Sequence, residues 1–284
     1  MRTMRSPHAF QFKQSTVQYW EYGDSTLPTI IMIHGFRGTH HGLARIIEQL
    51  PQYHIIVPDL PGFGASDPFI DQSHTIASYQ EFLQAFITNL KLSSPPILLG
   101  HSFGSIIASH FAANNADVID KLILINPIGA PALDGPKAVL SKLAIFYYFV
   151  GRKLPKKLSH SWLSTTAIVK IMSISMTKSK EPAMRRYIHD QHLTYFSRFA
   201  NPRVVAEAFT ASVSHDVREV AGKITVPTLL IAGEQDDITP LEKQHALSKL
   251  IKNSQLAVIN DVGHLIHYET AAEAAKLIRE FIDA

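Results

Sequence analysis

The stretch PPILLGHSFGSIIASHF, residues 95–111, passes from an apolar run through Gly-His-Ser-Phe-Gly into a segment with the apolar spacing of a helix. A strand that turns sharply into a helix holds one side chain clear of the sheet on a strained backbone, and the residues two before and two after it must be small. Gly100 and Gly104 meet this requirement around Ser102. The pattern predicts that Ser102 is a nucleophile, and a serine that only caps the helix is the alternative.

The surrounding sequence predicts an α/β fold with a mostly parallel central sheet flanked by helices. Six apolar runs lack the alternation of half-exposed strands, which is typical of parallel strands buried on both faces: 29–35, 53–60, 95–101, 121–127, 227–233 and 254–260. Helical patterns occupy 75–90, the segment after Ser102, and 270–282. Strands and helices that alternate in short units indicate a parallel sheet. The alternating run 9–23 predicts an antiparallel hairpin at the sheet edge.

A helical insertion interrupts this alternation. Residues 130–215 contain several helical patterns divided by prolines, and no convincing strand. From residue 131 to residue 210 there are 13 Lys/Arg and 4 Asp/Glu, a balance of +9, whereas the whole chain carries +3. We therefore predict a first part of the core at 1–129, a helical cap at 130–215 inserted after the sixth strand, and a second part of the core at 216–284.

Composition excludes several kinds of chemistry. The 284-residue chain has no cysteine, which excludes disulfides, thiolate catalysis and cysteine-bound metal. No apolar run approaches the roughly 18 residues of a membrane span, and the basic N-terminus lacks the apolar core of a signal peptide, so we expect a cytoplasmic protein. The basic residues of 131–210 lie among aromatic residues and form no recognition motif, so we do not expect a nucleic-acid partner.

A nucleophilic serine needs a base, and the base needs an orienting acid. In open α/β sheets such residues follow strands at the carboxyl edge. His264 follows the run 254–260 and is the predicted base. His34 also ends a run, and its following glycine suggests a different role. His267 is expected at the start of the last helix or on that helix's exposed side.

The loop GEQDDITP, residues 233–240, supplies the predicted acid. Asp236 is the first choice, because it stands three residues after the strand and four before Pro240, which is well placed to start a helix. Asp237 is the alternative. Glu234 lies too close to the end of the strand.

Two backbone amides are the predicted donors to an oxyanion. The stretch HGFRG, residues 34–38, ends the first core strand with glycines that let amide groups face the sheet edge. The amides of Phe36 and Phe103 form the natural pair, whether or not the two rings also pack in the core. Arg37 is expected at the surface, with a contact to substrate as the alternative.

These motifs together resemble the α/β-hydrolase-fold serine hydrolases. The resemblance rests on HGFRG (34–38), DLPGFGAS (59–66), GHSFG (100–104), GEQDDITP (233–240) and VGH (262–264), in the family's order. It implies the α/β-hydrolase fold with a cap, and it places nucleophile, acid and base on Ser102, Asp236 and His264 and the oxyanion amides on Phe36 and Phe103. The implied reaction is hydrolysis of small to medium apolar carboxylic esters through an acyl-enzyme, without cofactor or metal. The DLPGFGAS loop is expected to be structural.

Two other functions fit the same motifs. Related enzymes cleave carbon–carbon bonds of ring-fission products (vinylogous diketones), but Ser105 stands where their motif carries a second glycine, which weakens this interpretation. Other proteins of the fold act as small-molecule receptors with little turnover. Ser102 argues against dehalogenase and epoxide hydrolase relatives, which carry an aspartate at this position.

The expected partner is a small apolar ester. The stretch 137–158 combines aromatic residues with flanking Lys and Arg, which predicts either ordinary cap-to-core packing or an apolar acyl pocket with a basic rim and contact with a membrane surface. The sequence predicts no oligomeric state.

Overall fold

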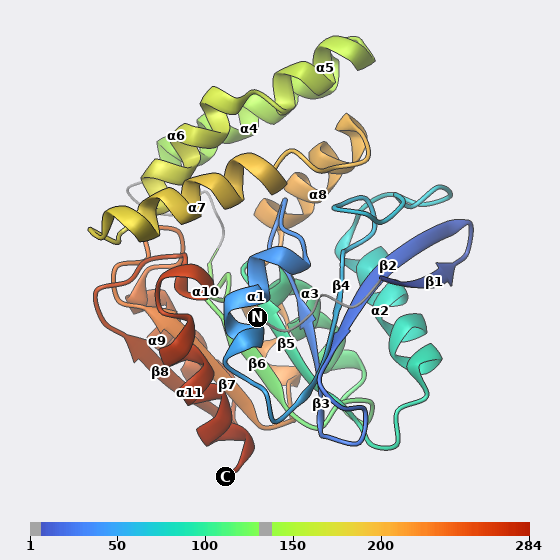
Figure 1. Cartoon of the computed structure of the whole chain (residues 1–284), viewed down its shortest axis with the longest axis vertical. Coiled ribbons are helices and arrows are strands. Elements are labelled where there is room, and N and C mark those ends of the chain that lie inside the picture. The colour runs from blue at the N-terminus through green and yellow to red at the C-terminus, as the bar shows by residue number, and fades with distance from the viewer. Residues whose placement is uncertain (1–6, 131–137) are drawn as a thin grey trace.

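One eight-stranded sheet forms the centre of the protein (Figure 1). The structure is a computed structural model, and it describes residues 7–130 and 138–284. The strands are β1 (His8–Phe12), β2 (Ser15–Tyr22), β3 (Thr29–Ile33), β4 (His54–Pro58), β5 (Ile97–His101), β6 (Leu122–Ile125), β7 (Thr228–Gly233) and β8 (Ser254–Ile259), in the spatial order β1-β2-β4-β3-β5-β6-β7-β8. The pairs β1–β2 and β2–β4 are antiparallel and all other pairs are parallel. This confirms the predicted mostly parallel α/β fold and its edge hairpin.

Helices cover both faces of the sheet because each strand sends alternate apolar side chains to opposite sides. Ile31 and Ile33 pack on the face covered by α2 (Ile76–Leu90), α3 (Phe103–Asn114) and α9 (Leu241–Leu250). Ile30 and Met32 pack on the face covered by α1 (Ala44–Glu48) and α11 (Ala271–Ile282). The short helices η1 (His40–Leu43), η2 (Val217–Glu219), η3 (Ala221–Lys223) and α10 (Ile266–Glu269) complete the core.

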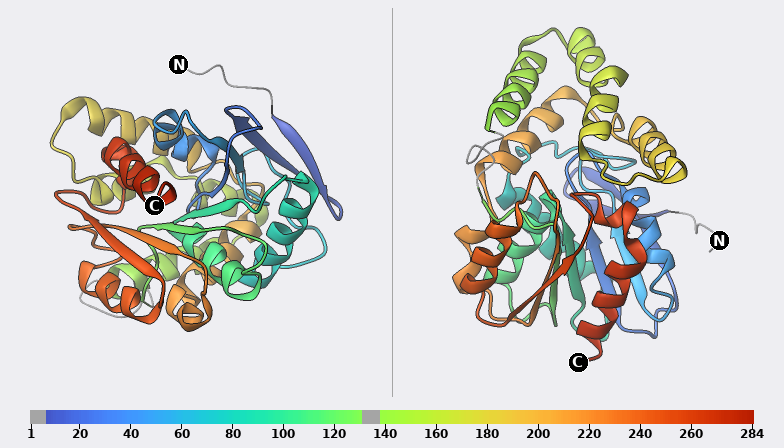
Figure 2. Two further views of the ribbon diagram at one scale, coloured as in Figure 1. Left: turned by 90° about the horizontal axis from the view of Figure 1, so that it is seen from below. Right: turned by 90° about the vertical axis from the view of Figure 1, so that its left-hand side faces the viewer.

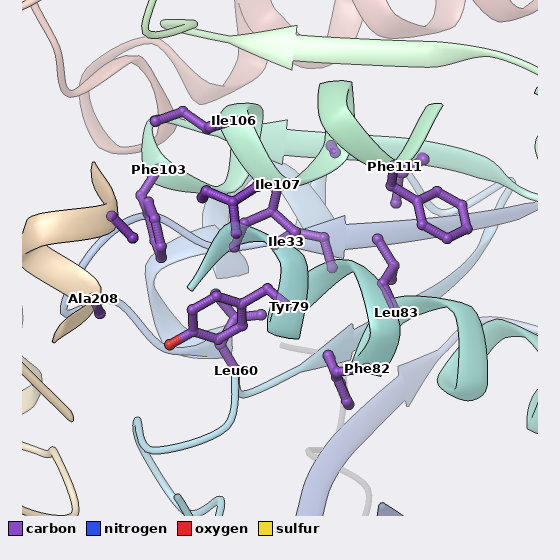
Figure 3. Packing of buried hydrophobic residues seen from close by; sticks show 14 of the residues in the cluster. Ile33, Leu60, Tyr79, Phe82, Leu83, Phe103, Ile106, Ile107, Phe111 and Ala208 are labelled. Carbon is purple, nitrogen blue, oxygen red and sulfur yellow. The ribbon is translucent and has the colours of Figure 1, made fainter. Parts of the chain in front are cut away.

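The core beneath α3 and α2 is closely packed (Figure 3). Phe103, Ile107 and Phe111 of α3 lie against Tyr79 and other buried residues of α2, and all four side chains are at most 1% exposed. Burial of each large apolar side chain stabilises the fold by about 1.5–3 kcal/mol. Because Phe103 is the residue directly after Ser102, this packing fixes the first turn of α3.

The turn between β5 and α3 has the strained geometry that the sequence predicts. Ser102 has φ +53° and ψ −118°, in a region that residues other than glycine rarely adopt. A Cβ atom on Gly104 would overlap the carbonyl oxygen of Ile33, and one on Gly100 would overlap that of Gly104. Ser102 stands at the N-cap of α3, but its side chain makes no capping hydrogen bond. The structure therefore contradicts the alternative of a capping serine.

In the described part of the chain between β6 and β7, five α-helices lie over the edge of the sheet where the parallel strands end (Figures 1 and 2). They are α4 (Ala138–Lys153), α5 (Lys156–Leu163), α6 (Thr166–Met176), α7 (Pro182–Tyr195) and α8 (Pro202–Ser214), and we call them the cap. Pro182 and Pro202 begin α7 and α8, because a proline at the first helical position has no amide to leave unpaired. Residues 131–137 of the predicted cap lie outside the described residues, and the limits at 130 and 215 stay a prediction.

The strand order predicts a crevice at the carboxyl ends of β3 and β5. The chain runs from β3 outward to β4 and then returns to form β5 on the other side of β3. Connections that leave two neighbouring strands in opposite directions open a gap at their carboxyl ends, where ligands bind in open α/β sheets. Phe36 follows β3 and Ser102 follows β5, so both flank this gap.

In residues 7–130 and 138–284 we find no helix that is both long and apolar enough to cross a bilayer.

Replacing Gly104 with Ala tests the close approach of α3 to β3. Helix propensity alone would favour Ala by about 1 kcal/mol. We expect the opposite, a loss of at least about 2 kcal/mol in the free energy of unfolding, because the new methyl group overlaps a main-chain oxygen. Urea denaturation measures the change. Gly222→Ala is the control, since a Cβ there has no neighbour within 4 Å. Equal stability of the two variants would contradict the packing described.

Candidate active site

Three of the residues selected from the sequence form one hydrogen-bonded chain. Nε2 of His264 lies 2.8 Å from Oγ of Ser102, and Nδ1 of His264 lies 2.8 Å from Oδ2 of Asp236. They come from the turn after β5, the loop between β7 and α9, and the loop between β8 and α10. His264 is 7% and Asp236 4% exposed, whereas Ser102 is partly exposed. Of these three hydrogen-bonded side chains, Ser102 is thus the one that a ligand can reach most readily.

The environment of Asp236 keeps its carboxyl group ionised. Burial alone would raise its pKa, but attraction to His264 and hydrogen bonds from His264 and Thr239 hold the pKa well below its usual range. Oδ1 accepts the amides of Ile238 (2.8 Å) and Thr239 (3.0 Å), and Oδ2 accepts the Thr239 hydroxyl at 2.5 Å. Because a carboxylate only accepts, Nδ1 of His264 carries the proton and Nε2 of the neutral ring is free to accept the Ser102 hydroxyl.

Asn126 is a component of the site that the sequence analysis did not select. It directly follows β6 with φ +45° and is fully buried. Its Nδ2 donates to Oδ2 of Asp236 (2.8 Å) and to the carbonyl oxygen of Gly263 (3.3 Å). One side chain therefore joins the acid loop to the loop that carries the histidine. An asparagine at the end of a buried strand, where a left-handed backbone is tolerated, is the signal that could have identified it.

Ser105 also supports the turn, although it departs from the glycine of related motifs. Its buried hydroxyl donates to the carbonyl oxygen of Ser102 at 2.5 Å and accepts the amide of Ile128 at 3.1 Å. The hydroxyl thus links the strained residue to the loop after β6. A glycine at this position would leave both main-chain groups without this partner.

The other acids lie in different surroundings. Oδ2 of Asp237 is 2.6 Å from Nζ of Lys178, in the cap segment after α6. Glu234 accepts the amide of Asp261. Because Oδ2 of Asp236 lies 2.8 Å from Nδ1 of His264, the geometry favours Asp236 as the partner of that ring.

The two other histidines considered from the sequence, His34 and His267, lie in different surroundings. Nε2 of His34 accepts the amide of Leu60, so this ring supports the loop after β4. The sequence predicts His267 at the start of the last helix or on that helix's exposed side. Both alternatives are wrong, because His267 lies in α10, which ends before the last helix, α11, begins. The side chain is 6% exposed and its ring centroid is 4.1 Å from that of His101, because α10 packs against the core rather than facing solvent.

The expectation that Arg37 lies at the surface is also wrong. The side chain is 1% exposed, because the cap covers the loop after β3. Its Nε donates to the carbonyl oxygen of Phe196 (2.7 Å), and its Nη2 donates to that of Leu163 (2.9 Å). Leu163 ends α5 and Phe196 is the C-cap of α7, so the guanidinium lies at the carbonyl ends of two helices. No carboxylate among the described residues forms an ion pair with Arg37, and the helix dipoles supply the compensating negative charge.

The segment that precedes Arg37 passes beside the Ser102 side chain. A Cβ on Gly35 would lie 3.3 Å from Cβ of Ser102, which places the backbone of residues 35–36 next to the hydroxyl. The Phe103 amide lies at the first residue of α3, where helix amides have no partner in the helix. The two amides selected from the sequence therefore come from segments on either side of the crevice.

Aromatic rings from the core and the cap surround Phe36. Its ring centroid lies 6.4 Å from Phe103, 5.7 Å from Tyr148 of α4 and 5.8 Å from Phe209 of α8. Phe103 is buried in the core and Phe36 is partly buried, so both rings pack as core aromatics. The surroundings of the crevice are therefore apolar on the side of the loop after β3.

In the described ranges there is no group of three or more His, Asp or Glu suited to hold a metal ion.

Comparison with known proteins identifies relatives across most of the chain. The sequence profile of the alpha/beta hydrolase fold family matches residues 28–271. The chain is 25% identical over 276 residues to lipase 1 of Psychrobacter immobilis, covering 94% of this chain and 81% of that protein. It is 26% identical over 264 residues to a monoacylglycerol lipase of Mus musculus, covering 90% of this chain and 75% of that protein. The crystal structure of a thermophilic esterase from Thermogutta terrifontis superposes with a TM-score of 0.78 at 24% identity, covering 98% of each chain.

Replacing Arg37 with Met tests the connection between the cap and the β3 loop. Methionine keeps most of the volume but leaves the carbonyl groups of Phe196 and Leu163 without their donor. We expect the free energy of unfolding to fall by about 2–4 kcal/mol, because buried acceptors without partners cost about 1–3 kcal/mol each. Urea denaturation measures the loss, with Arg279→Met as the control, because Arg279 is half-buried and donates to the carbonyl oxygen of Gln49 near the surface. A loss no larger than that of the control would contradict the buried role.

Buried histidines make stability depend on pH. Burial lowers the pKa of His101 to about 3 and that of His192 to about 3, and it lowers the pKa of His267 strongly. In the unfolded chain these rings take up protons near pH 6.5, so between about pH 6.5 and 3 the unfolded state binds more protons. The free energy of unfolding must therefore fall as the pH is lowered through this window, by at most about 1.4 kcal/mol per pH unit for each ring.

The melting temperature should therefore decrease steadily from about pH 7 to about pH 5. Thermal unfolding followed by circular dichroism measures it. His192→Gln should flatten the slope, because glutamine takes up no proton, while His8→Gln at the exposed end of β1 should leave the slope as it is. A melting temperature independent of pH in this range would be inconsistent with three buried neutral histidines.

Proposed function

The chain belongs to the alpha/beta hydrolase fold family, and on this premise we propose that it is a serine hydrolase that cleaves carboxylic esters with small to medium apolar acyl groups. Its relatives include proteins named lipase and monoacylglycerol lipase, which act on ester bonds. The observation that carries the proposal is the hydrogen-bonded chain Ser102–His264–Asp236, with its serine on a strained turn at the crevice. This arrangement matches the requirements for an activated serine nucleophile.

In the acylation step, Oγ of Ser102 attacks the carbonyl carbon of the ester. Nε2 of His264 takes the hydroxyl proton as the carbon–oxygen bond forms. The ring becomes positively charged, and the ionised Asp236 stabilises this charge while holding the ring in one orientation. Asn126 and Thr239 keep Asp236 in place through their hydrogen bonds.

Attack turns the carbonyl oxygen into an oxyanion, for which we propose the amides of Phe36 and Phe103 as donors. The Phe103 amide belongs to the N-terminus of α3, whose partial positive charge favours an anion. Removal of one such donor costs roughly 2.7–4 kcal/mol of transition-state stabilisation. The close approach of Gly35 to Ser102 supports the choice of the Phe36 amide.

Collapse of the tetrahedral intermediate breaks the bond to the leaving alkoxide, which takes the proton from His264 and departs as an alcohol. Water then attacks the acyl-enzyme and gives its proton to Nε2 of His264. The second intermediate releases the carboxylic acid and returns the proton to Oγ of Ser102. The reaction consumes one ester and one water and requires no cofactor.

The aromatic rings around Phe36 support an apolar acyl group. Tyr148 and Phe209 extend this surface into the cap, and the ring centroids of these two residues are 4.0 Å apart. Apolar walls with a few polar groups at the reacting centre are typical of small-molecule sites. The helices that supply Tyr148 and Phe209 belong to the cap, so we propose that the cap selects the acyl group.

Substitution of the triad gives the direct test. Ser102→Ala should remove labelling by a fluorophosphonate probe and hydrolysis of p-nitrophenyl esters. Asp236→Asn should lower kcat by about 10⁴-fold, because the amide no longer holds the histidine in the required tautomer. Asp237→Asn is the matched control and should retain activity, since that carboxylate faces Lys178. Steady-state kinetics on esters graded in acyl length measure all three.

Three outcomes would contradict the proposal. Absence of Ser102-dependent labelling would exclude a serine hydrolase. Labelling by the probe without multiple turnovers on any ester would favour a ligand-binding receptor. Cleavage of a vinylogous diketone with a flat, near-zero ester profile would favour the carbon–carbon bond hydrolase.

A further inference from the structure

The outer part of the cap has an unusual charge distribution. Residues 138–180 contain eight Lys/Arg and no Asp or Glu. In the described part of the chain, no carboxylate forms an ion pair with Arg152, Lys153, Lys157 or Lys170, and all four are exposed. The charges of these four residues therefore add to one positive surface, whereas Lys178 near the end of the segment pairs with Asp237.

The same segment exposes large apolar side chains. Ten such side chains are exposed among the described residues, and six of them lie on three cap helices: Phe146 and Phe149 on α4, Leu158 and Trp162 on α5, and Ile171 and Ile174 on α6. We call these six residues the outer cap face. Phe146, Leu158 and Ile171 are 60–66% exposed. Single exposed apolar residues are common, but such a concentration on one structural unit indicates an interaction surface.

The three helices that carry the outer cap face lie on the side of the molecule away from the sheet (Figures 1 and 2). Helices α4, α5 and α6 form the outermost layer, with α7 and α8 between them and the core (Figures 1 and 2). Tyr147 of α4 and Trp162 of α5 exchange two hydrogen bonds, from the Tyr147 hydroxyl (2.8 Å) and from the indole N–H (3.1 Å) to each other's carbonyl oxygens. These bonds fix α4 against α5, so the apolar side chains project from a defined scaffold.

Exposed basic residues occur beside the exposed apolar residues in all three helices. Phe146, Phe149 and Lys153 recur at the spacing of one helical face, and Nζ of Lys153 lies 5.8 Å from the ring centroid of Phe149. Lys157 adjoins Leu158, and Lys170 adjoins Ile171. Long basic side chains can reach the headgroup level while neighbouring rings enter the acyl boundary. This combination fits a lipid surface better than an acidic protein, whose partner site would keep its apolar residues in a contiguous core.

From these observations we infer that the outer cap face docks on an anionic lipid bilayer. Attraction between the basic residues and anionic headgroups brings the cap to the surface, and insertion of the exposed apolar side chains holds it there. One part of the inference rests on the proposed ester hydrolysis, namely that the docked protein takes its ester substrates from the bilayer. Binding itself involves none of the triad residues, so it can be measured separately.

Vesicle co-sedimentation of the full chain tests the inference. Wild-type protein should sediment with vesicles of phosphatidylcholine and phosphatidylglycerol, bind much less to phosphatidylcholine alone, and dissociate at high salt because ions screen the attraction. The triple variant Arg152→Gln, Lys153→Gln, Lys157→Gln should lower the partition coefficient by at least about tenfold, since each basic residue near an anionic surface contributes about fivefold. The triple variant Phe146→Ser, Phe149→Ser, Leu158→Ser should also weaken binding by about tenfold.

Matched controls use exposed residues outside the cap. Lys223→Gln, Lys249→Gln, Lys252→Gln removes the same number of charges, and Ile70→Ser, Leu250→Ser removes exposed apolar groups elsewhere. Both controls should bind like the wild type. All variants should hydrolyse a soluble short-chain ester at the wild-type rate, which shows that they are folded. If the wild type cleaves no ester yet sediments with anionic vesicles, the proposed function fails and the docking face stands.

Two results would overturn the docking face. One is the absence of wild-type binding to anionic vesicles at low salt. The other is binding that both cap variants retain. Retention of the wild type on immobilised polyglutamate, without any vesicle binding, would assign the surface to an acidic protein instead.

Discussion

The structure depends on the close approach of Gly104 to the carbonyl oxygen of Ile33. This approach lets α3 begin directly at the end of β5, and it forces Ser102 into a backbone conformation that costs free energy. The buried packing of α3 against α2 offsets that cost. The packed core thus maintains the strained backbone of Ser102. As a consequence, the Ser102 side chain lies beyond the end of the sheet, beside Gly35. The proposed nucleophile, base and oxyanion donors can meet only because this turn is so tight.

The cap is connected to both sides of the candidate site. On one side, Arg37 donates to the carbonyl ends of two cap helices from the residue next to Phe36. On the other side, Lys178 pairs with Asp237, and Glu269 accepts the amides that follow α6. A movement of the cap would therefore displace both the loop after β3, which carries Arg37, and the loop after β7, which carries Asp237. This arrangement provides a physical link between the surface that we assign to lipid and the residues that we assign to chemistry.

Much of the site followed from local sequence. Parallel strands buried on both faces appear as continuous apolar runs, and the residues after them must gather at one edge of the sheet. Ser102, Asp236 and His264 were selected on that basis, and they form one hydrogen-bonded chain. The sequence favoured Asp236 over Asp237 by its distance from Pro240, but only the fold shows which neighbour each of these adjacent carboxylates meets. In the folded protein Asp237 meets Lys178 of the cap.

The amino-acid sequence by itself determined the order of strands and helices, the strained turn and the types of group at the sheet edge, because these depend on short-range spacing and on small residues. Tertiary structure alone decided the burial of Arg37 and the roles of Asn126 and Ser105. Each of these depends on partners more than twenty residues away, at Phe196, at Asp236 and at Ile128. The local sequence does not show whether a polar side chain is buried, because burial depends on hydrogen-bond partners from helices and loops that are distant in the sequence.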